Sequence, residues 1–153
     1  MTIPREVAKV FAYITHGNSI LILNHPDHPE AGIQVPAGSI EYGESPRNGV
    51  LREAFEESGL ASIRLIRFLG LVRVKFPKEG FHEFHNRWFF HLNCDDDPPD
   101  IWRHQEMTPS DGSPPVWFEF SWVDLNHIAL DWGHDAMLDR LRHSLEFGTD
   151  KTD

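Results

Sequence analysis

Short apolar runs separated by turn residues make up the first third of the chain. Residues 7–15 are mostly apolar and rich in strand formers, and residues 20–23 repeat this character after His16-Gly17-Asn18-Ser19. Two such runs joined by a turn of this composition predict a β-hairpin. Residues 25–32, HPDHPEAG, predict a loop because proline and glycine interrupt regular structure. Residues 33–35 then predict a short strand that leads into Pro36-Ala37-Gly38.

Residues 46–58 carry the clearest helix signals in the chain. Ser45 is a good N-cap, Pro46 suits the first helical position, and Gly59 supplies a C-terminal stop. These three signals predict a helix that begins at Pro46 and ends at Ser58.

The second half of the chain predicts three strands and a terminal helix. Residues 63–76 and 83–93 predict long strands on either side of a turn at residues 77–80, and residues 116–123 predict another strand. Residues 135–147 carry leucines at helical spacing. Between these elements, residues 94–115 are polar and contain five prolines. This stretch is too long for a simple connection and predicts a binding loop or flap.

The order of elements predicts an α/β (α+β) domain. Strands and helices follow as β-β-β-α-β-β-β-α, with no internal repeat and no linker, so residues 1–153 are expected to form a single domain. A mixed sheet with helices packed on it is the architecture that buries the apolar faces of these elements.

Charge and cysteine content narrow the classes of function. The formal charge of −10 argues against a general nucleic-acid binder, which needs basic surface. No apolar run approaches the length of a membrane span, and the first residues lack a signal-peptide pattern. Cys94 is the one cysteine and suits a reducing compartment. A cytoplasmic protein is therefore expected.

The predicted helix at residues 46–58 concentrates carboxylates on one side. On a helical wheel Glu53, Glu56 and Glu57 fall together, related as i, i+3 and i+4, and are predicted to face solvent. The opposite, apolar side is predicted to pack on the sheet, and it consists of Val50, Leu51, Ala54 and Phe55. A solvated polar face is the simplest interpretation of this pattern.

Two penalties favour a metal site over that simple interpretation. Like charges at these spacings repel one another, and the C-terminal half of a helix disfavours anions. The helix therefore gains nothing from three acids there unless a cation binds them. Oxygen ligands without cysteine or neighbouring imidazole favour magnesium, manganese or calcium over zinc.

A glycine-punctuated loop before the helix extends this pattern into a motif. The sequence from Gly38 to Leu60 contains G-x5-E-x7-R-E-A-x-E-E-x-G-L and resembles the signature of the Nudix hydrolases. The matching residues are Gly38, Glu44, Arg52, Glu53, Ala54, Glu56, Glu57, Gly59 and Leu60. The strands predicted on both sides are similar to the αβα sandwich of that family.

The resemblance implies a reaction and a metal. Nudix hydrolases cut a phosphoanhydride bond in a nucleoside diphosphate linked to a further group X, and they use magnesium or manganese. It also implies that Glu53 and Glu57 are the main metal ligands. Glu56 would be a further ligand or a water-orienting base, and the Gly38 carbonyl would complete the metal shell. Glu44 and Arg52 would brace the loop against the helix.

Several assignments remain open in the sequence. Family members often take a further ligand or base from a late glutamate, and Glu106 and Glu119 are the candidates, with Glu119 slightly favoured. Trp102 could stack on a base or anchor its loop. Three strand cations could meet phosphates or face solvent, namely Arg73, Lys75 and Arg87.

The identity of X is not readable from the sequence, and a homodimer is an open expectation. An alternative function is a Nudix-fold module that binds a nucleotide, or regulates a partner, without catalysis. The intact set of motif residues counts against this alternative.

Overall fold

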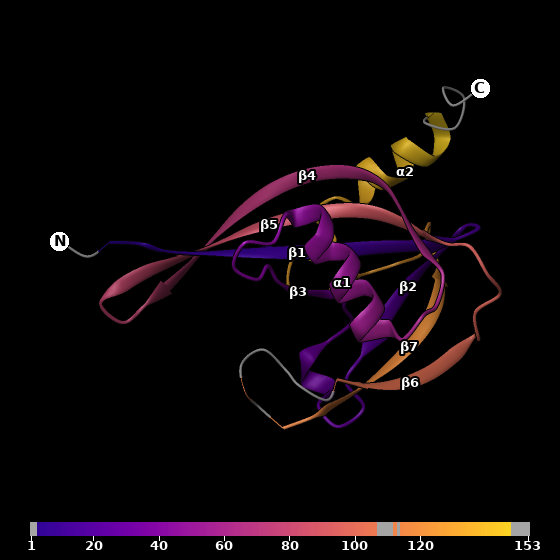
Figure 1. The fold of residues 1–153 in the computed structure, drawn as a ribbon, viewed down its shortest axis with the longest axis horizontal. Helices are drawn as coiled ribbons and strands as arrows, with labels where there is room; N and C mark the ends of the chain where they lie inside the picture. The colour runs from indigo at the N-terminus through magenta and orange to yellow at the C-terminus, as the bar shows by residue number, and fades with distance from the viewer. Residues whose placement is uncertain (1–2, 107–111, 113, 148–153) are drawn as a thin grey trace.

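A mixed β-sheet between two helices forms the body of the protein (Figure 1). The computed structural model describes residues 3–106, 112 and 114–147. Its strands are β1 (Arg5–His16), β2 (Ser19–Asn24), β3 (Ala37–Ser39), β4 (Ile63–Lys78), β5 (Phe81–Cys94), β6 (Ile101–Glu106) and β7 (Val116–Asp124). Its helices are α1 (Pro46–Ser58) and α2 (Leu138–Phe147), with a short 3-10 turn at Pro29–Ala31.

The strands lie in the order β4-β5-β1-β2-β7-β6, and β3 pairs with β1. Strands β1 and β5 are parallel, whereas the other pairs are antiparallel. This arrangement confirms the predicted α/β architecture with a mixed sheet. The hairpin of β4 and β5 projects at one end, beside the start of β1 (Figure 1).

Alternate residues of the central strand β1 feed two separate cores. Val10, Ala12 and Ile14 pack with Val50 and Ala54 of α1. On the other face of the sheet, Phe11 and Tyr13 pack in a cluster that includes leucines of α2, Leu138 and Leu141. Successive residues of a strand point to opposite faces, so the two helices cover opposite sides of the sheet.

Most of the predicted elements are confirmed with small changes of boundary. The β1–β2 hairpin pairs Thr15 with Ile20 around the predicted turn. Strands β4 and β5 pair along their whole length, and the terminal helix begins at Leu138 rather than at residue 135.

Two predictions about the loops are wrong. The short strand expected at residues 33–35 lies instead at β3, where Ala37, Gly38 and Ser39 pair with β1, while Gln34 makes an isolated bridge to Leu23. The polar stretch at residues 94–115 contains β6, which pairs with β7 along six residues. Residues 107–111 and 113 lie outside the described residues, so the flap prediction is not tested for that part of the chain.

Neither helix in the described part of the chain is long and apolar enough to cross a membrane.

Candidate active site

Helix α1 is fixed at both ends. Ser45 Oγ accepts a hydrogen bond from the Asn48 amide at 3.1 Å, which satisfies one of the free N–H groups of the first turn. At the other end Gly59 adopts the left-handed conformation, with φ of 73°, and its N–H reaches the Phe55 carbonyl. The predicted caps are therefore present, and they hold the acidic helix in place.

Strand β6 supplies additional partners for the C-terminal carbonyls of α1. Trp102 Nε1 donates to the Ser58 carbonyl at 2.8 Å, and His104 Nδ1 donates to the Glu57 carbonyl at 2.9 Å. The Trp102 ring also stacks on Phe120 of β7. Trp102 is thus an anchor between β6 and α1, which corresponds to the anchoring alternative. His104 follows Trp102 at the two-residue spacing of a strand face, which is the sequence signal for its contact with α1.

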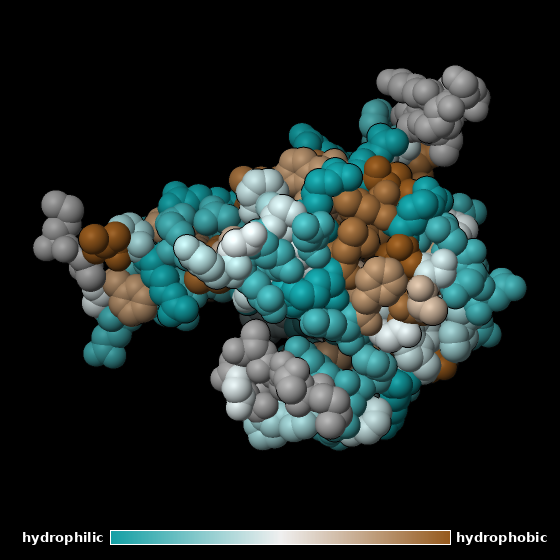
Figure 2. Space-filling view, viewed as in Figure 1, coloured by the Kyte–Doolittle hydropathy of each residue, from teal (hydrophilic) through white to brown (hydrophobic). Residues whose placement is uncertain are grey.

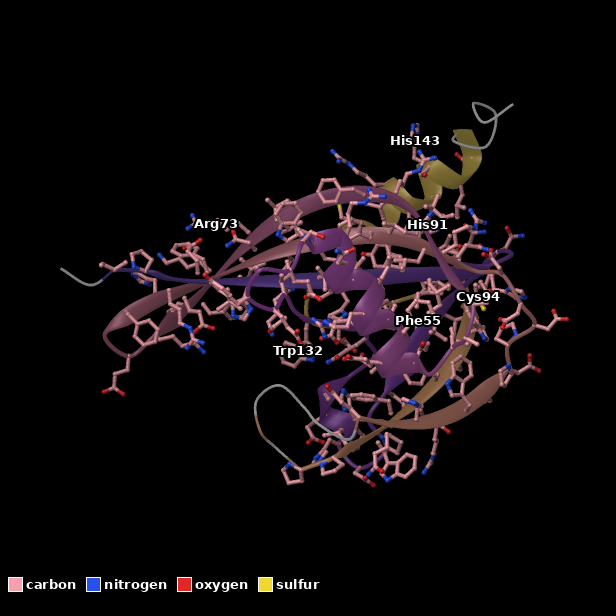
Figure 3. The ribbon with its side chains drawn as sticks, viewed as in Figure 1. Phe55, Arg73, His91, Cys94, Trp132 and His143 are labelled. Atoms are coloured by element: carbon pink, nitrogen blue, oxygen red, sulfur yellow. The ribbon has the colours of Figure 1, made fainter. Side chains whose placement is uncertain are left out.

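The helical wheel misplaced two of the three glutamates. Glu53 and Glu57 are buried, with 8% and 7% of their surfaces exposed, whereas Phe55 on the supposed packing face is 38% exposed. Figure 3 labels Phe55 on α1, and Figure 2 shows apolar surface on this face of the molecule. The reason is that β3 and β6 cover the acidic side of the helix. The wheel assumed that only the central sheet would cover it.

Strand β3 lies directly against the buried carboxylates. A Cβ atom on Gly38 would overlap the carboxylate of Glu53, so a larger residue at this position would force the Glu53 side chain to move. The Ala37 amide donates to Glu57 Oε1 at 3.4 Å. The sequence motif therefore contains a glycine because the strand and the acidic helix approach each other closely here.

Burial makes both carboxyl groups weaker acids than usual. Burial raises the pKa of Glu57 well above its ordinary value, and the charges of Glu53 and Glu106 raise it further. Burial also raises the pKa of Glu53, although Arg52 opposes the shift. A bound cation would remove these penalties, because it favours the charged form of each group.

Arg52 links the loop before α1 to the helix. Its guanidinium donates to both oxygens of Glu44, with Nε–Oε2 at 2.7 Å and Nη2–Oε1 at 2.9 Å, and Nη2 also donates to the Ser39 carbonyl. Its Nη1 donates to Glu53 at 2.9 Å and to Glu56 at 3.3 Å. Arg52 therefore bonds Glu44 of the loop together with Glu53 and Glu56 of the helix.

Glu56 occupies a different environment from its two neighbours. Its side chain is 61% exposed and lies at the edge of the Arg52 cluster. The helix therefore presents two buried carboxylates and one that is accessible to water.

Strand β7 orients Glu119 away from α1. Phe118 and Phe120 pack in the core beneath α1, so Glu119 between them points to the opposite face. Its nearest charged partner is Arg103, at 3.8 Å. The geometry does not place Glu119, the candidate favoured in the sequence, beside the buried glutamates.

Strand β6 orients Glu106 toward α1. Trp102 and His104 contact the helix, and Glu106 shares their face because side chains alternate along a strand. Its charge acts on the pKa values of both Glu53 and Glu57. Glu106 belongs to a paired strand and not to the loop expected from the sequence.

The carboxylate oxygens of Glu53 and Glu57 suit a divalent ion, although the side chains are not already arranged around a common metal position. Among the described residues, no three acidic, histidine or cysteine side chains are placed to hold a metal. Glu53 and Glu57 nevertheless offer buried carboxylate oxygens whose negative charge is disfavoured without a cation.

The fold and this carboxylate-bearing helix define a known family. The NUDIX domain model matches residues 5–141, so the chain belongs to the NUDIX domain family. This family typically uses a divalent metal.

Several known proteins are similar to the chain. The NAD-capped RNA hydrolase NudC of Haemophilus influenzae (strain PittEE) is 37% identical over 79 residues, which are 50% of this chain and 30% of that protein. The NudC of Vibrio parahaemolyticus is 32% identical over 81 residues. The matched part thus spans less than a third of these curated relatives.

Solved structures share the fold at low sequence identity. A UDP-X diphosphatase superimposes with a TM-score of 0.66 at 16% identity, covering 95% of this chain and 64% of that chain. An ADP-ribose pyrophosphatase from Streptococcus suis gives a TM-score of 0.58 at 16% identity, covering 93% and 91%. These likenesses show the fold alone.

Proposed function

We propose that this protein is a magnesium- or manganese-dependent pyrophosphohydrolase that cuts the phosphoanhydride bond of a nucleoside diphosphate linked to a group X. The observation that carries the proposal is the pair of buried carboxylates, Glu53 and Glu57, held between Gly38 of β3 and Glu106 of β6. Buried acids without a neutralising cation are costly, which favours a metal-binding role. Family membership and the relatives named above support the same reaction.

In this proposal Glu53 and Glu57 hold the metal, with Glu56 and the Gly38 carbonyl as further contributors. The bound metal would neutralise charge on the diphosphate and lower the pKa of a coordinated water. Glu44 and Arg52 fix the loop and the helix relative to each other. Such positioning matters because phosphoryl-type displacement depends mainly on alignment and on charge neutralisation.

Glu106 is the residue that we propose as the base or as an additional ligand. It lies on the face of β6 that contacts α1. Its charge raises the pKa of both Glu53 and Glu57, which supports a position close to both carboxylates. A carboxylate there can accept a proton from water that attacks the diphosphate.

A substrate panel with and without magnesium tests the proposed reaction. The panel would contain ADP-ribose, a UDP-sugar, a dinucleoside tetraphosphate, a nucleoside triphosphate, NAD and NAD-capped RNA, with release of nucleoside monophosphate or phosphate measured. Magnesium-dependent turnover of at least one compound is expected. No turnover of any of them, together with saturable nucleotide binding, would favour a non-catalytic binding module.

Glutamine substitutions should separate the two late glutamates. Glu106→Gln is expected to lower kcat by about 10²–10⁴-fold, the usual contribution of a general base, because it removes the carboxylate that faces α1. Glu119→Gln is the matched control, and kcat should stay within about threefold of the parent protein, since Glu119 faces the other side of β7. Steady-state kinetics on the best substrate of the panel measures both. The reverse ranking would show that Glu119 carries the role.

A further inference from the structure

A cavity of about 230 Å³ lies beside β3 and is lined by cationic side chains. Its walls include Lys9, Phe11, Gln34, Gly38, Arg87 and His134. A cationic cavity is unexpected in a chain of formal charge −10. Gly38 connects this cavity to the acidic helix, because the same residue contacts the Glu53 carboxylate.

Arg87 is a buried cation without a carboxylate partner. It is 9% exposed, and no acidic group in the described part of the chain lies within ion-pair distance of its guanidinium. Nη1 donates to the Trp132 carbonyl at 2.8 Å, while Nε has no hydrogen-bond partner. A buried cation destabilises the folded protein by roughly several kcal/mol unless an anion compensates its charge.

Lys9 places a second positive charge beside Arg87. The two residues are direct register partners on the parallel strands β1 and β5, so their side chains lie next to each other on one face of the sheet. Like charges in this position destabilise a sheet. Lys9 has no carboxylate partner within ion-pair distance among the described residues.

Two histidines, His85 and His134, also line the cavity. The Val35 amide donates to His134 Nδ1, and burial together with the Arg87 charge lowers the pKa of His134 to about 4, so this ring is neutral at pH 7. His85 pairs with Glu83 at 2.7 Å, which leaves that carboxylate already occupied.

The two cations and the acidic helix lie on opposite faces of the sheet. Phe11, two residues after Lys9, and Phe89, two residues after Arg87, belong to the core on the α2 face. Glu53 reaches Gly38 from α1. A metal held by α1 would neutralise the diphosphate that is cut, so Lys9 and Arg87 are positioned for a second, separate anion.

We propose that Arg87 and Lys9 form a specificity subsite that binds a phosphate group carried by X, in addition to the diphosphate that is hydrolysed. The proposal rests on the proposed function for its assignment to X. The guanidinium offers planar donors suited to phosphate oxygens, and Lys9 contributes a point charge. Substrates with a phosphate on X should therefore be preferred over those without one.

Binding of inorganic phosphate to the metal-free protein tests the subsite independently of catalysis. Calorimetric titration in chelator, at constant ionic strength, should show saturable binding by the parent protein. Arg87→Gln should weaken it at least about tenfold, a loss typical of one charge-assisted hydrogen bond. Lys9→Gln, at a partly exposed position, should weaken it about threefold or more and keeps the test valid if Arg87→Gln does not fold.

Arg64→Gln is the matched control, since Arg64 pairs with Asp95 on exposed surface outside the cavity. Its phosphate affinity should equal that of the parent protein. Absence of saturable binding by the parent protein, or equal binding by the Lys9 and Arg87 variants, would overturn the proposal.

A matched pair of substrates tests the assignment to X. ADP-ribose and ADP-ribose 1″-phosphate differ by one phosphate on X, and the second should have the higher kcat/KM. Lys9→Gln should abolish this preference chiefly by raising the KM of the phosphorylated substrate. A purely structural role would instead lower kcat/KM equally for the two substrates. Arg87-dependent phosphate binding without any hydrolysis would retain the subsite and refute the proposed function. Hydrolysis without any preference for the phosphorylated substrate, and without phosphate binding, would refute the subsite and retain the proposed function.

Discussion

Replacing Glu57 by glutamine is expected to abolish most hydrolysis while stabilising the metal-free protein. The activity should fall because a buried carboxylate proposed as a metal ligand is lost, and we expect kcat/KM to drop about 10²–10³-fold, as for other groups that stabilise transition-state charge. The stability should rise because glutamine carries no charge to bury. Kinetics in magnesium and thermal melting in chelator measure the two effects.

The pH dependence of stability provides a direct check on Glu57. Its pKa is raised in the folded state, so the folded protein holds a proton that the unfolded chain releases. The contribution of Glu57 to the free energy of unfolding is therefore fully present below the ordinary pKa of 4.5 and is lost as the pH rises through the folded-state pKa. In Glu57→Gln this decrease should be smaller.

Glu53→Gln should lose activity to a similar degree but gain less stability, because it also weakens the contact with Arg52. Glu146→Gln on exposed α2 surface is the matched control and should change neither property. Full activity in either the Glu53 or the Glu57 variant would contradict the proposed metal site.

Arg52→Ala is expected to lower both stability and activity. The substitution removes two hydrogen bonds to Glu44 and one to the Ser39 carbonyl, and it leaves the buried Glu53 without its cation. We expect a loss of about 2–4 kcal/mol in the free energy of unfolding, from charge-assisted hydrogen bonds at a mostly buried position. Denaturant unfolding in chelator measures this loss without interference from metal.

Acid titration distinguishes this brace from a general loss of packing. Arg52 holds the pKa of Glu44 at about 2 through hydrogen bonds, so the stabilisation is present above pH 4.5 and is lost as the pH falls toward 2. Arg52→Ala should flatten this part of the profile. Arg64→Ala, which breaks the exposed pair with Asp95, is the control and should leave the free energy of unfolding nearly unchanged, because solvent screens a surface ion pair. An unchanged melting temperature in Arg52→Ala would show that the brace is misassigned.

The sequence was informative where local chemistry decides structure. Ser45, Pro46 and Gly59 defined α1 because caps and stops act on neighbouring backbone groups. The turn at residues 16–19 defined the first hairpin for the same reason. Motif spacing also brought Gly38, Arg52 and Glu53 together correctly, since close packing and ion pairing require particular residue types there.

The predictions failed where distant segments decide the environment. Glu53 and Glu57 looked solvent-facing because a wheel contains no information about β3 or β6, which cover that side of α1. Strand β6 was missed because its sequence, IWRHQE, has a polar composition, although pairing with β7 makes it a strand. Glu119 looked suitable from its position in a strand, yet the direction of a strand side chain depends on the register of the whole sheet.

The contact between Gly59 and His104 has a consequence for how the site tolerates change in chain length. A Cβ on Gly59 would come within 2.6 Å of the His104 ring, so β6 is located by direct packing against the end of α1. Residues 95–100 connect β5 to β6. Relatives with insertions there should keep a carboxylate at the position of Glu106, because its placement depends on a surface fit and not on the number of residues that lead to it.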